Sequence, residues 1–160
     1  YLTMINQAKR YLYITTPYFI PDKSFIDALL IAKLSGVDIN LVIPGVPDKK
    51  TVYHVTYSYL EELLKAGINV YLYPGFIHSK MVVCDDRVAS IGTANLDVRS
   101  FSMNFEVTAL MFGKKEVIET IQIAVNDISK SHKLTYLEYK NRPKKDKIQE
   151  HLFRLCAPLM

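Results

Sequence analysis

The chain has 160 residues, of which 49% are hydrophobic and 22% are charged. These proportions exclude wholesale disorder, and the length suits one domain with a hydrophobic core better than two. A formal net charge of +4 is compatible with lipid and nucleic-acid partners alike. The sequence has neither a secretory signal pattern nor an apolar run of about 18 residues, so no membrane-spanning segment is predicted. Because the chain opens on Tyr1 without a methionine, we expect it to be a piece of a longer protein.

Apolar periodicity and turn residues predict alternating strands and helices. In chain order, the first predicted elements are a strand over 11–15, an aromatic turn over 18–22, a helix from Phe25 to Gly36 capped by Asp22 or Ser24, a strand over 38–43, a helix over 51–66 and a strand over 68–73. The later ones are strands over 80–84, 88–91 and 104–111 and a helix from Lys114 to about Ser129. This alternation predicts an α/β domain with a central mixed sheet flanked by helices.

The last part of the chain is rich in basic residues. Five cations surround one acidic residue, Asp146: Lys140, Arg142, Lys144, Lys145 and Lys147. Such a run is compatible with a solvated surface or with a contact to phosphate-rich partners. We therefore predict a single catalytic domain over residues 1–160, with a basic C-terminal extension at about 131–160.

The stretch from Phe76 to Asp86 carries residues suited to chemistry. Side chains alternate between the faces of a strand, so His78 and Lys80 are predicted to project together. A lysine beside an imidazole lowers the pKa of the imidazole unless a phosphate shares the site or a carboxylate supports the ring. Glu106 is such a carboxylate, and a histidine–glutamate dyad is a plausible expectation. Asp85 falls on the opposite face and is interpreted as structural support.

The sequence Gly92-Thr93-Ala94-Asn95 follows an apolar strand. A glycine turn there would let the Thr93 hydroxyl, the Asn95 amide and nearby backbone N–H groups approach an anion. Lys80 would add full positive charge. These groups together match the requirements of phosphoryl chemistry, in which donors and cations stabilise the phosphate oxygens.

His78-x-Lys80, with four residues between Lys80 and Asp85 and the 92–95 segment beyond, is similar to the signature of the phospholipase D superfamily. Further stretches resemble one branch of it, the bacterial cardiolipin synthases: residues 16–22, 92–101, 104–107 and 154–159. The resemblance covers nearly the whole chain, and the ending resembles that family's carboxyl terminus. It implies the second catalytic half of an enzyme with two His-x-Lys motifs.

The resemblance implies a two-step displacement at phosphorus, in which one histidine forms a phosphohistidine and a second one protonates the leaving alcohol. It assigns the catalytic motif to His78, Lys80, Glu106 and, in a supporting role, Asp85. It assigns phosphate binding to Lys80, Thr93 and Asn95. Whether His78 is the nucleophile or the general acid stays open, although two-motif relatives favour the general acid. No cofactor and no metal is expected, because lysines and amides carry the charge.

For a cardiolipin synthase, the implied reaction condenses two phosphatidylglycerol molecules into cardiolipin and glycerol. The isolated chain is then expected to hold an incomplete active site, which the missing amino-terminal half or a second subunit completes. The alternative function is a nuclease or phosphodiesterase that acts as a homodimer, since short single-motif superfamily members work in that way. A third possibility is a folded fragment that binds phosphate without activity.

The implied partners are the anionic phospholipid phosphatidylglycerol and a membrane surface, whereas nucleic acid is not expected. The parent enzyme is predicted at the bacterial cell membrane, with this domain on the cytoplasmic side and the fragment itself soluble. Tyr18, Phe19 and Phe76 could line a lipid-contacting wall or belong to the core. Asp97 and Arg99 could pair with each other or shape the pocket.

Overall fold

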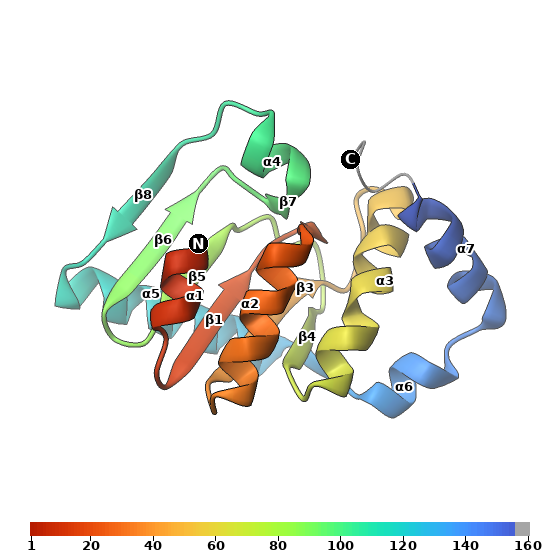
Figure 1. Cartoon of the computed structure of the whole chain (residues 1–160), viewed down its shortest axis with the longest axis horizontal. Helices are drawn as coiled ribbons and strands as arrows, with labels where there is room; N and C mark the ends of the chain where they lie inside the picture. The colour runs from red at the N-terminus through yellow and green to blue at the C-terminus, as the bar shows by residue number, and fades with distance from the viewer. Residues whose placement is uncertain (156–160) are drawn as a thin grey trace.

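The structure is a computed structural model that describes residues 1–155. A central sheet carries helices on both faces (Figure 1). The strands are β1 Tyr11–Thr15, β2 Phe19–Ile20, β3 Asp38–Pro44, β4 Asn69–Tyr73, β5 Met81–Cys84, β6 Val88–Gly92, β7 Leu96–Asp97, β8 Thr108–Met111 and β9 His132–Leu134. The helices are α1 Leu2–Gln7, α2 Lys23–Leu34, α3 Lys50–Lys65, α4 Val98–Ser102, α5 Lys114–Lys130, α6 Tyr136–Asn141 and α7 Lys144–Arg154.

The main sheet has seven strands in the order β8-β6-β5-β1-β3-β4-β9. β1, β3 and β4 run parallel, and the other neighbouring pairs are antiparallel. The predicted α/β fold with a central mixed sheet is thereby confirmed. β2 and β7 form a separate parallel pair, and β2 lies inside the segment that the sequence predicts as an aromatic turn.

Side chains that alternate along the strands enter two separate apolar layers. On the face covered by α1, α2 and α3, Leu12 and Ile14 of β1 pack with Leu41 of β3. On the other face, Met81 and Val83 of β5 pack against α5. Because the central strands are buried on both faces, their sequences read as nearly continuous apolar runs.

The ends of the predicted helices are confirmed to within a few residues. The Asp22 carboxylate accepts a hydrogen bond from the Phe25 N–H at 2.8 Å and so caps α2. Gly36 follows this helix with a φ of 91°, and Gly67 follows α3 with a φ of 79°. Both values lie in the left-handed region that glycine adopts without steric cost, which explains why each helix stops there.

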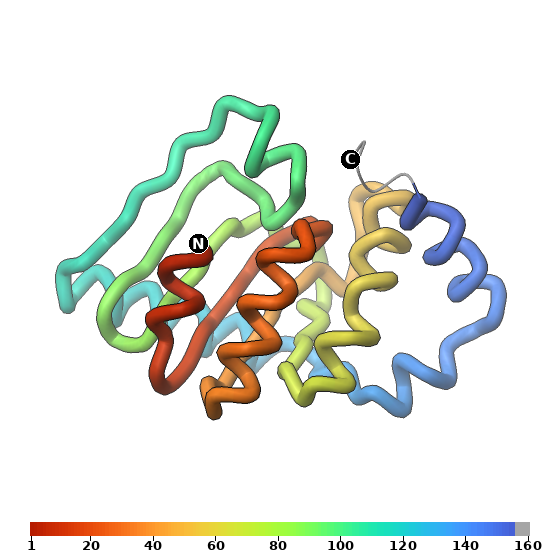
Figure 2. Tube along the Cα trace, in the orientation of Figure 1, coloured from red at the N-terminus to blue at the C-terminus, as the bar shows by residue number. Residues whose placement is uncertain are grey.

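The C-terminal part of the described chain folds back over α3. Figure 2 shows the chain leaving β9 and passing through α6 and α7 along the outer side of α3. The Tyr139 hydroxyl donates to the Tyr57 carbonyl at 3.0 Å, and Arg142 forms a largely buried ion pair with Glu150. Arg142 is therefore a structural residue and not a solvated cation. Residues 156–160 of the predicted extension lie outside the described residues.

The predicted strand over 104–111 is shorter in the structure, where β8 begins only at Thr108. Its ladder with β6 ends at the pair Gly92–Thr108. Beyond that pair, the Val107 N–H donates to the Thr93 hydroxyl at 2.9 Å, so a side chain takes the place of a backbone partner. Gly92 is explained by close packing and not by the expected turn, because a Cβ there would lie 2.4 Å from the Val107 carbonyl oxygen.

Several elements, most of them short, were not predicted from the sequence: α1, α4, α6, α7, β7 and β9. α4 has only five residues, too few to display a helical apolar period. Within residues 1–155, no helix combines the length and the apolar character that crossing a bilayer requires.

Candidate active site

Loops at one end of the main sheet bring together residues that are distant in sequence. β5 begins at this end beside the last residue of β1, since Thr15 pairs with Met81. β6 ends at the same place, opposite the start of β8. The residues before β5, after β6 and before β8 therefore meet. They include His78, Lys80, Thr93, Asn95 and Glu106.

His78 and Lys80 lie side by side as strand alternation predicts, although both precede the first residue of β5. Lys80 Nζ lies 3.0 Å from Nδ1 of His78 and donates to the His78 carbonyl oxygen at 2.8 Å. An ammonium group has only donors, so charged Lys80 makes Nδ1 an acceptor. The proton of a neutral imidazole then resides on Nε2, on the side of the ring away from Lys80.

The surroundings of this pair disfavour positive charge. Partial burial and the adjacent Lys80 ammonium lower the pKa of His78, and Asp48 opposes them. Lys80 is only 8% exposed, and this burial lowers its pKa against the opposing charges of Glu106, Asp48 and Asp97. A phosphate diester beside Lys80 would supply a close negative charge, so the pair is suited to receive an anion.

Two aromatic rings flank the imidazole of His78. Phe76 stacks on it with ring centroids 5.4 Å apart and an interplanar angle of 25°. Tyr18 meets it edge-on at 6.4 Å, and the Tyr18 hydroxyl donates to Asp48. Phe19 is fully buried in the core instead. Tyr18 and Phe76 therefore line the site, and Phe19 is a core residue.

Glu106 reaches the site without contacting the imidazole of His78. Its carboxylate accepts a hydrogen bond from the Thr93 hydroxyl and another from Asn104 Nδ2, the latter at 3.1 Å. These two bonds hold the pKa of Glu106 below its ordinary value. Within the described residues, His78 and Glu106 form no hydrogen bond, and Lys80 is the side chain that contacts a ring nitrogen.

Asn95 and Thr93 differ in their availability to a ligand. The Asn95 Oδ1 is buried and has no hydrogen-bond partner among residues 1–155, which is rare for a buried polar atom. A rotation of this amide would present its NH₂ group to a phosphate oxygen. The Thr93 hydroxyl proton already goes to Glu106. Thr93 is thus already bound to Glu106, whereas the Asn95 amide still has an unused hydrogen-bonding group.

Asp85 lies at the opposite end of β5, roughly 16 Å from Lys80 at 3.3 Å per strand residue. Its buried carboxylate accepts hydrogen bonds from the backbone N–H groups of Lys9, Arg10 and Tyr11 at 2.9 to 3.1 Å. Burial opposes ionisation of this carboxyl, but the three amides outweigh burial and hold its pKa below the ordinary value. Asp85 thus ties the connection before β1 to the end of β5.

Asp97 and Arg99 have different partners in the structure. The Asp97 carboxylate accepts a hydrogen bond from the Ser100 N–H at 2.6 Å and caps α4. Arg99 Nε donates to Asn104 Oδ1 at 3.3 Å. Asn104 also donates to Glu106, so Arg99 helps to fix the loop that presents this glutamate.

Asp48 is the site residue that sequence reasoning missed. Its negative charge acts on His78 and Lys80 alike. Asp48 lies in the loop between β3 and α3, at the carboxyl end of a parallel strand. Loops at the carboxyl ends of parallel strands meet at one edge of the sheet. The position of Asp48 just after a predicted strand could therefore have indicated that it belongs to the site.

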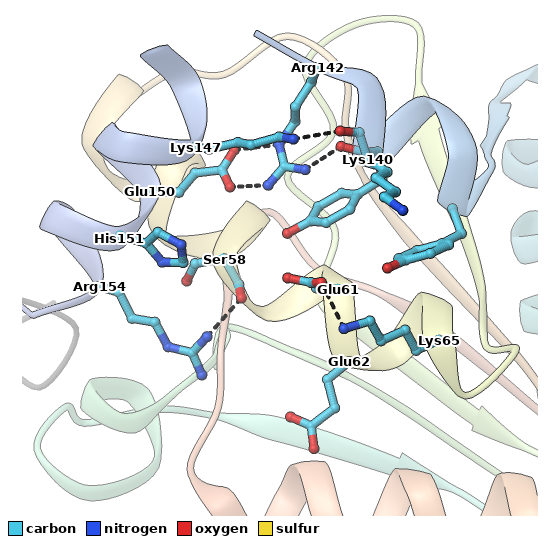
Figure 3. A pocket seen from close by; sticks show the side chains of 12 residues that line it. Ser58, Glu61, Glu62, Lys65, Lys140, Arg142, Lys147, Glu150, His151 and Arg154 are labelled. Atoms are coloured by element: carbon cyan, nitrogen blue, oxygen red, sulfur yellow. Dashed lines mark hydrogen bonds and ion pairs between the residues drawn. The ribbon is translucent and has the colours of Figure 1, made fainter. Parts of the chain in front are cut away.

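A hollow of about 530 Å³ lies between α3, α6 and α7, and its lining includes none of the site residues (Figure 3). Many of its charged side chains have partners within the fold. Arg142 pairs with Glu150, Lys65 lies 2.8 Å from Glu61, and Arg154 donates to a backbone carbonyl of α3 at 2.8 Å. We interpret this hollow as the joint that holds α6 and α7 on α3.

The sheet-end site provides one imidazole, one buried ammonium group and one unsatisfied amide. These groups can transfer a proton, balance the charge of a phosphate and orient one of its oxygens. A displacement at phosphorus through a covalent intermediate needs both a nucleophile and a proton donor, and His78 can be one of them. Among residues 1–155, no group of three His, Cys, Asp or Glu side chains is placed to hold a metal ion.

Residues 1–128 match the family described as cardiolipin synthase, PLD-like domain. The major cardiolipin synthase ClsA of Bacillus subtilis is 50% identical over 161 residues, which cover 100% of this chain and 33% of that protein. Phosphatidylserine synthase of Haemophilus influenzae Rd KW20 has a similar structure, with a TM-score of 0.78 at 18% identity, covering 99% of this chain and 41% of that one. Nuc from Salmonella typhimurium, a phospholipase D family member, gives a TM-score of 0.72 at 18% identity, covering 84% of this chain and 88% of that one.

At 18% identity, the two solved structures establish a shared fold alone. The chain spans about a third of the length of the curated relatives it matches. The family match, in contrast, includes His78, Lys80 and the residues around them. The chain therefore belongs to the family of PLD-like domains of cardiolipin synthases.

Proposed function

We propose that the chain is the carboxyl-terminal catalytic half of an enzyme that condenses two phosphatidylglycerol molecules into cardiolipin and glycerol. The observation that supports this most strongly is the 50% identity, across the whole chain, to a protein named as a cardiolipin synthase. The geometry is compatible with it, because an imidazole and a buried ammonium group lie together at the sheet end. Such a pair suits a phosphodiester substrate.

The proposed reaction exchanges one phosphodiester for another. In the first step, a histidine nitrogen attacks phosphorus, a P–N bond forms, and the P–O bond to the leaving glycerol breaks. In the second step, the hydroxyl of another phosphatidylglycerol attacks, the P–N bond breaks, and a new P–O bond forms. The proton that the leaving glycerol gains equals the proton that the attacking hydroxyl loses. Because one phosphodiester bond replaces another, no nucleotide energy source is needed.

We assign the proton transfer to His78. To act as the acid, His78 would be an imidazolium, whose charge the bound phosphodiester would offset. Its Nε2 proton, on the side of the ring away from Lys80, would pass to the departing glycerol oxygen and leave a neutral imidazole. The same nitrogen would accept the proton of the attacking hydroxyl in the second step. The nucleophilic histidine would then belong to a second His-x-Lys motif in the other half of the enzyme.

The phosphate would be held by Lys80 and Asn95. Two of the three Lys80 N–H groups are directed at His78, and the third can donate to a phosphate oxygen. Asn95 would add its NH₂ group as a donor after rotation of the amide. Glu106 would act as a positioning residue, since it fixes the Thr93 hydroxyl and places negative charge near Lys80.

The substrate is a bilayer lipid, so the enzyme would work at the surface of the bacterial cell membrane, with this domain on the cytoplasmic side. Phe76 supports lipid contact, because its ring is 54% exposed while it stacks on His78. An exposed aromatic ring beside a polar site suits the interface between headgroups and acyl chains.

The test uses the purified full-length enzyme that contains this chain. One sample receives vesicles of phosphatidylglycerol labelled in the terminal glycerol, and a second receives labelled single-stranded DNA. We expect cardiolipin and free glycerol in equal amounts and intact DNA. Cleaved DNA without cardiolipin would support the nuclease alternative, and phosphatidic acid as the sole lipid product would make the enzyme a hydrolase.

A further inference from the structure

One side of α7 combines exposed apolar side chains with lysines. Ile148, Leu152 and Leu155 are 67%, 60% and 79% exposed, and their spacing of four and three residues places them on one side of the helix. Lys144 lies one turn before Ile148, and Lys145 lies two turns before Leu152, so both exposed lysines belong to the same side. These five residues are called the α7 outer face.

The opposite side of α7 makes the contacts that hold the helix on the domain. Phe153 packs with Ile20 of β2 and Val55 of α3. Glu150 is buried in its ion pair with Arg142. Because these contacts do not involve the α7 outer face, packing within residues 1–155 does not explain its apolar side chains.

The lysines of the α7 outer face lack acidic partners within the described chain. The two acidic residues of α7, Asp146 and Glu150, line a hollow of about 380 Å³ against α3. Among residues 1–155, Lys144 and Lys145 form no ion pair. Two cations in a first turn also oppose the positive end of the helix dipole, so local helix stability does not explain them. An anionic partner would balance both charges.

The exposed apolar residues of α2 provide a contrast on the same molecule. Ile31 and Leu34 are 61% and 86% exposed. The charges one and two turns before Ile31 are Asp27 and Lys23, which pair with each other at 2.7 Å. Apolar exposure therefore occurs on both helices, and the unbalanced lysines distinguish the α7 outer face.

This combination suits an anionic lipid surface better than a protein partner. Lysine is depleted at protein–protein interfaces, whereas helices that lie among lipid headgroups carry lysines beside an apolar side. A lysine stem can pack on apolar groups while its ammonium group reaches the phosphates. A helix also satisfies its own backbone, so it can contact lipid without a polypeptide partner.

The carboxyl-terminal end of α7 lies at the same end of the sheet as the candidate site. Phe153 contacts Ile20, and the strand of Ile20 pairs with β7, which directly follows residues 93–95 of the site. Figure 1 shows this end of α7 beside the start of α3, the helix that follows the loop of Asp48. A lipid surface on the α7 outer face would therefore lie close to the site.

We propose that the α7 outer face binds the surface of an anionic phospholipid bilayer and so holds the domain on the membrane that contains its substrate. This inference rests on the proposed function, in which the substrate is itself an anionic bilayer lipid. It also gives a partner to two lysines of the basic run over 140–147.

Tryptophan fluorescence tests the surface without relying on turnover. The chain contains no tryptophan, so Leu152→Trp and Leu34→Trp each report on one position. With phosphatidylglycerol vesicles, we expect a blue shift from Leu152→Trp and none from Leu34→Trp, because only the first indole enters the headgroup region. The apparent affinity for phosphatidylcholine vesicles should be at least about tenfold weaker, because both lysines lose their attraction to an anionic surface.

A pair of double variants tests the lysines in the α7 reporter. Lys144→Gln with Lys145→Gln should lower the apparent affinity for phosphatidylglycerol vesicles at least about tenfold. Lys114→Gln with Lys115→Gln makes the same change in the first turn of α5, where Glu119 lies near Lys115, and should leave the affinity unchanged. Equal losses in the two variants would contradict a specific role of the α7 lysines.

Three other outcomes would overturn the inference. They are the absence of a blue shift from Leu152→Trp, an equal shift from Leu34→Trp, and a shift that rises with protein concentration without vesicles, which would make a second copy the occupant. Cardiolipin synthesis by the full-length enzyme is measured separately. Its absence beside a lysine-dependent shift would contradict the proposed function alone, and its presence without the shift would contradict this inference alone.

Discussion

At the scale of single residues, Lys80 determines which nitrogen of His78 carries the proton. Its buried ammonium group contacts Nδ1 and the carbonyl oxygen of the same histidine. A carboxylate in that place would accept a hydrogen bond from Nδ1–H and leave a lone pair on Nε2, as a nucleophile needs. The observed lysine contact instead leaves Nε2 protonated in the neutral ring, so the geometry does not favour His78 as the nucleophile.

Asp85 is predicted to matter for stability and not for chemistry. Asp85→Asn keeps a residue that tolerates the φ of 51° at this position but removes the charge that three backbone N–H groups bind. We expect the free energy of unfolding to fall by about 2 kcal/mol at neutral pH, in urea titrations of the isolated chain.

The pH dependence follows from the depressed pKa of Asp85. A carboxyl whose pKa is lower in the folded state stabilises the fold above its unfolded pKa of about 3.9, and this contribution disappears as pH falls through the folded pKa. The difference in the free energy of unfolding between the wild type and Asp85→Asn should therefore become smaller below about pH 4. The exposed Asp86→Asn change is the matched control and should have a smaller effect. A difference in the free energy of unfolding that stays constant with pH would contradict this explanation.

The sequence alone predicted the proximity of His78 to Lys80, because alternation held through the loop before β5. It could not predict the partners of Glu106. That expectation assumed a strand from Asn104, whereas the Thr93 side chain binds the Val107 backbone and Glu106 itself, so the chain leaves the sheet there. Side chains that compete with the backbone for hydrogen bonds leave no periodic pattern in a sequence.

At the scale of elements, the arm formed by α6 and α7 contains a buried ion pair between Arg142 and Glu150. Side-chain exposure is 14% for Arg142 and 4% for Glu150. The guanidinium also lies over the Tyr139 ring at 3.4 Å. Both charged groups are removed from water, so each charge would be strongly destabilising without the opposite charge of its partner.

Glu150→Ala should therefore lower the free energy of unfolding by about 3 kcal/mol, because it leaves the Arg142 charge buried without its partner. The double change Arg142→Met with Glu150→Leu should recover most of that loss. Urea titrations of the isolated chain measure both. The exposed pair of Lys115 and Glu119 on α5 supplies the control, Glu119→Ala, with an expected effect below about 0.5 kcal/mol. An equally small effect of Glu150→Ala would show that the ion pair does not hold the arm.

Long elements were predictable from the sequence, and short ones were not. α2, α3 and α5 have clear apolar periods with glycine or a capping residue at an end. β2 and β7 have two residues each and exist because they pair with each other, and α6 and α7 are stabilised by contacts to α3. Such elements depend on tertiary contacts, which a local pattern cannot express.

At the scale of the whole molecule, the two ends of the sheet differ in how they are covered. The β9 edge carries the ion-paired arm on α3, whereas β8 is the outermost strand at the opposite edge (Figure 1).

The most direct measurement of the proposed role of this chain is the rate of phosphatidyl transfer by full-length enzyme that carries His78→Asn. The substitution removes the proton donor and keeps a polar side chain of similar size. We predict that cardiolipin formation from labelled phosphatidylglycerol falls at least about 100-fold, the typical contribution of a general acid. His151→Asn, at an exposed histidine of α7, should retain the wild-type rate. A near-normal rate in His78→Asn would contradict the assignment of the chemistry to this residue.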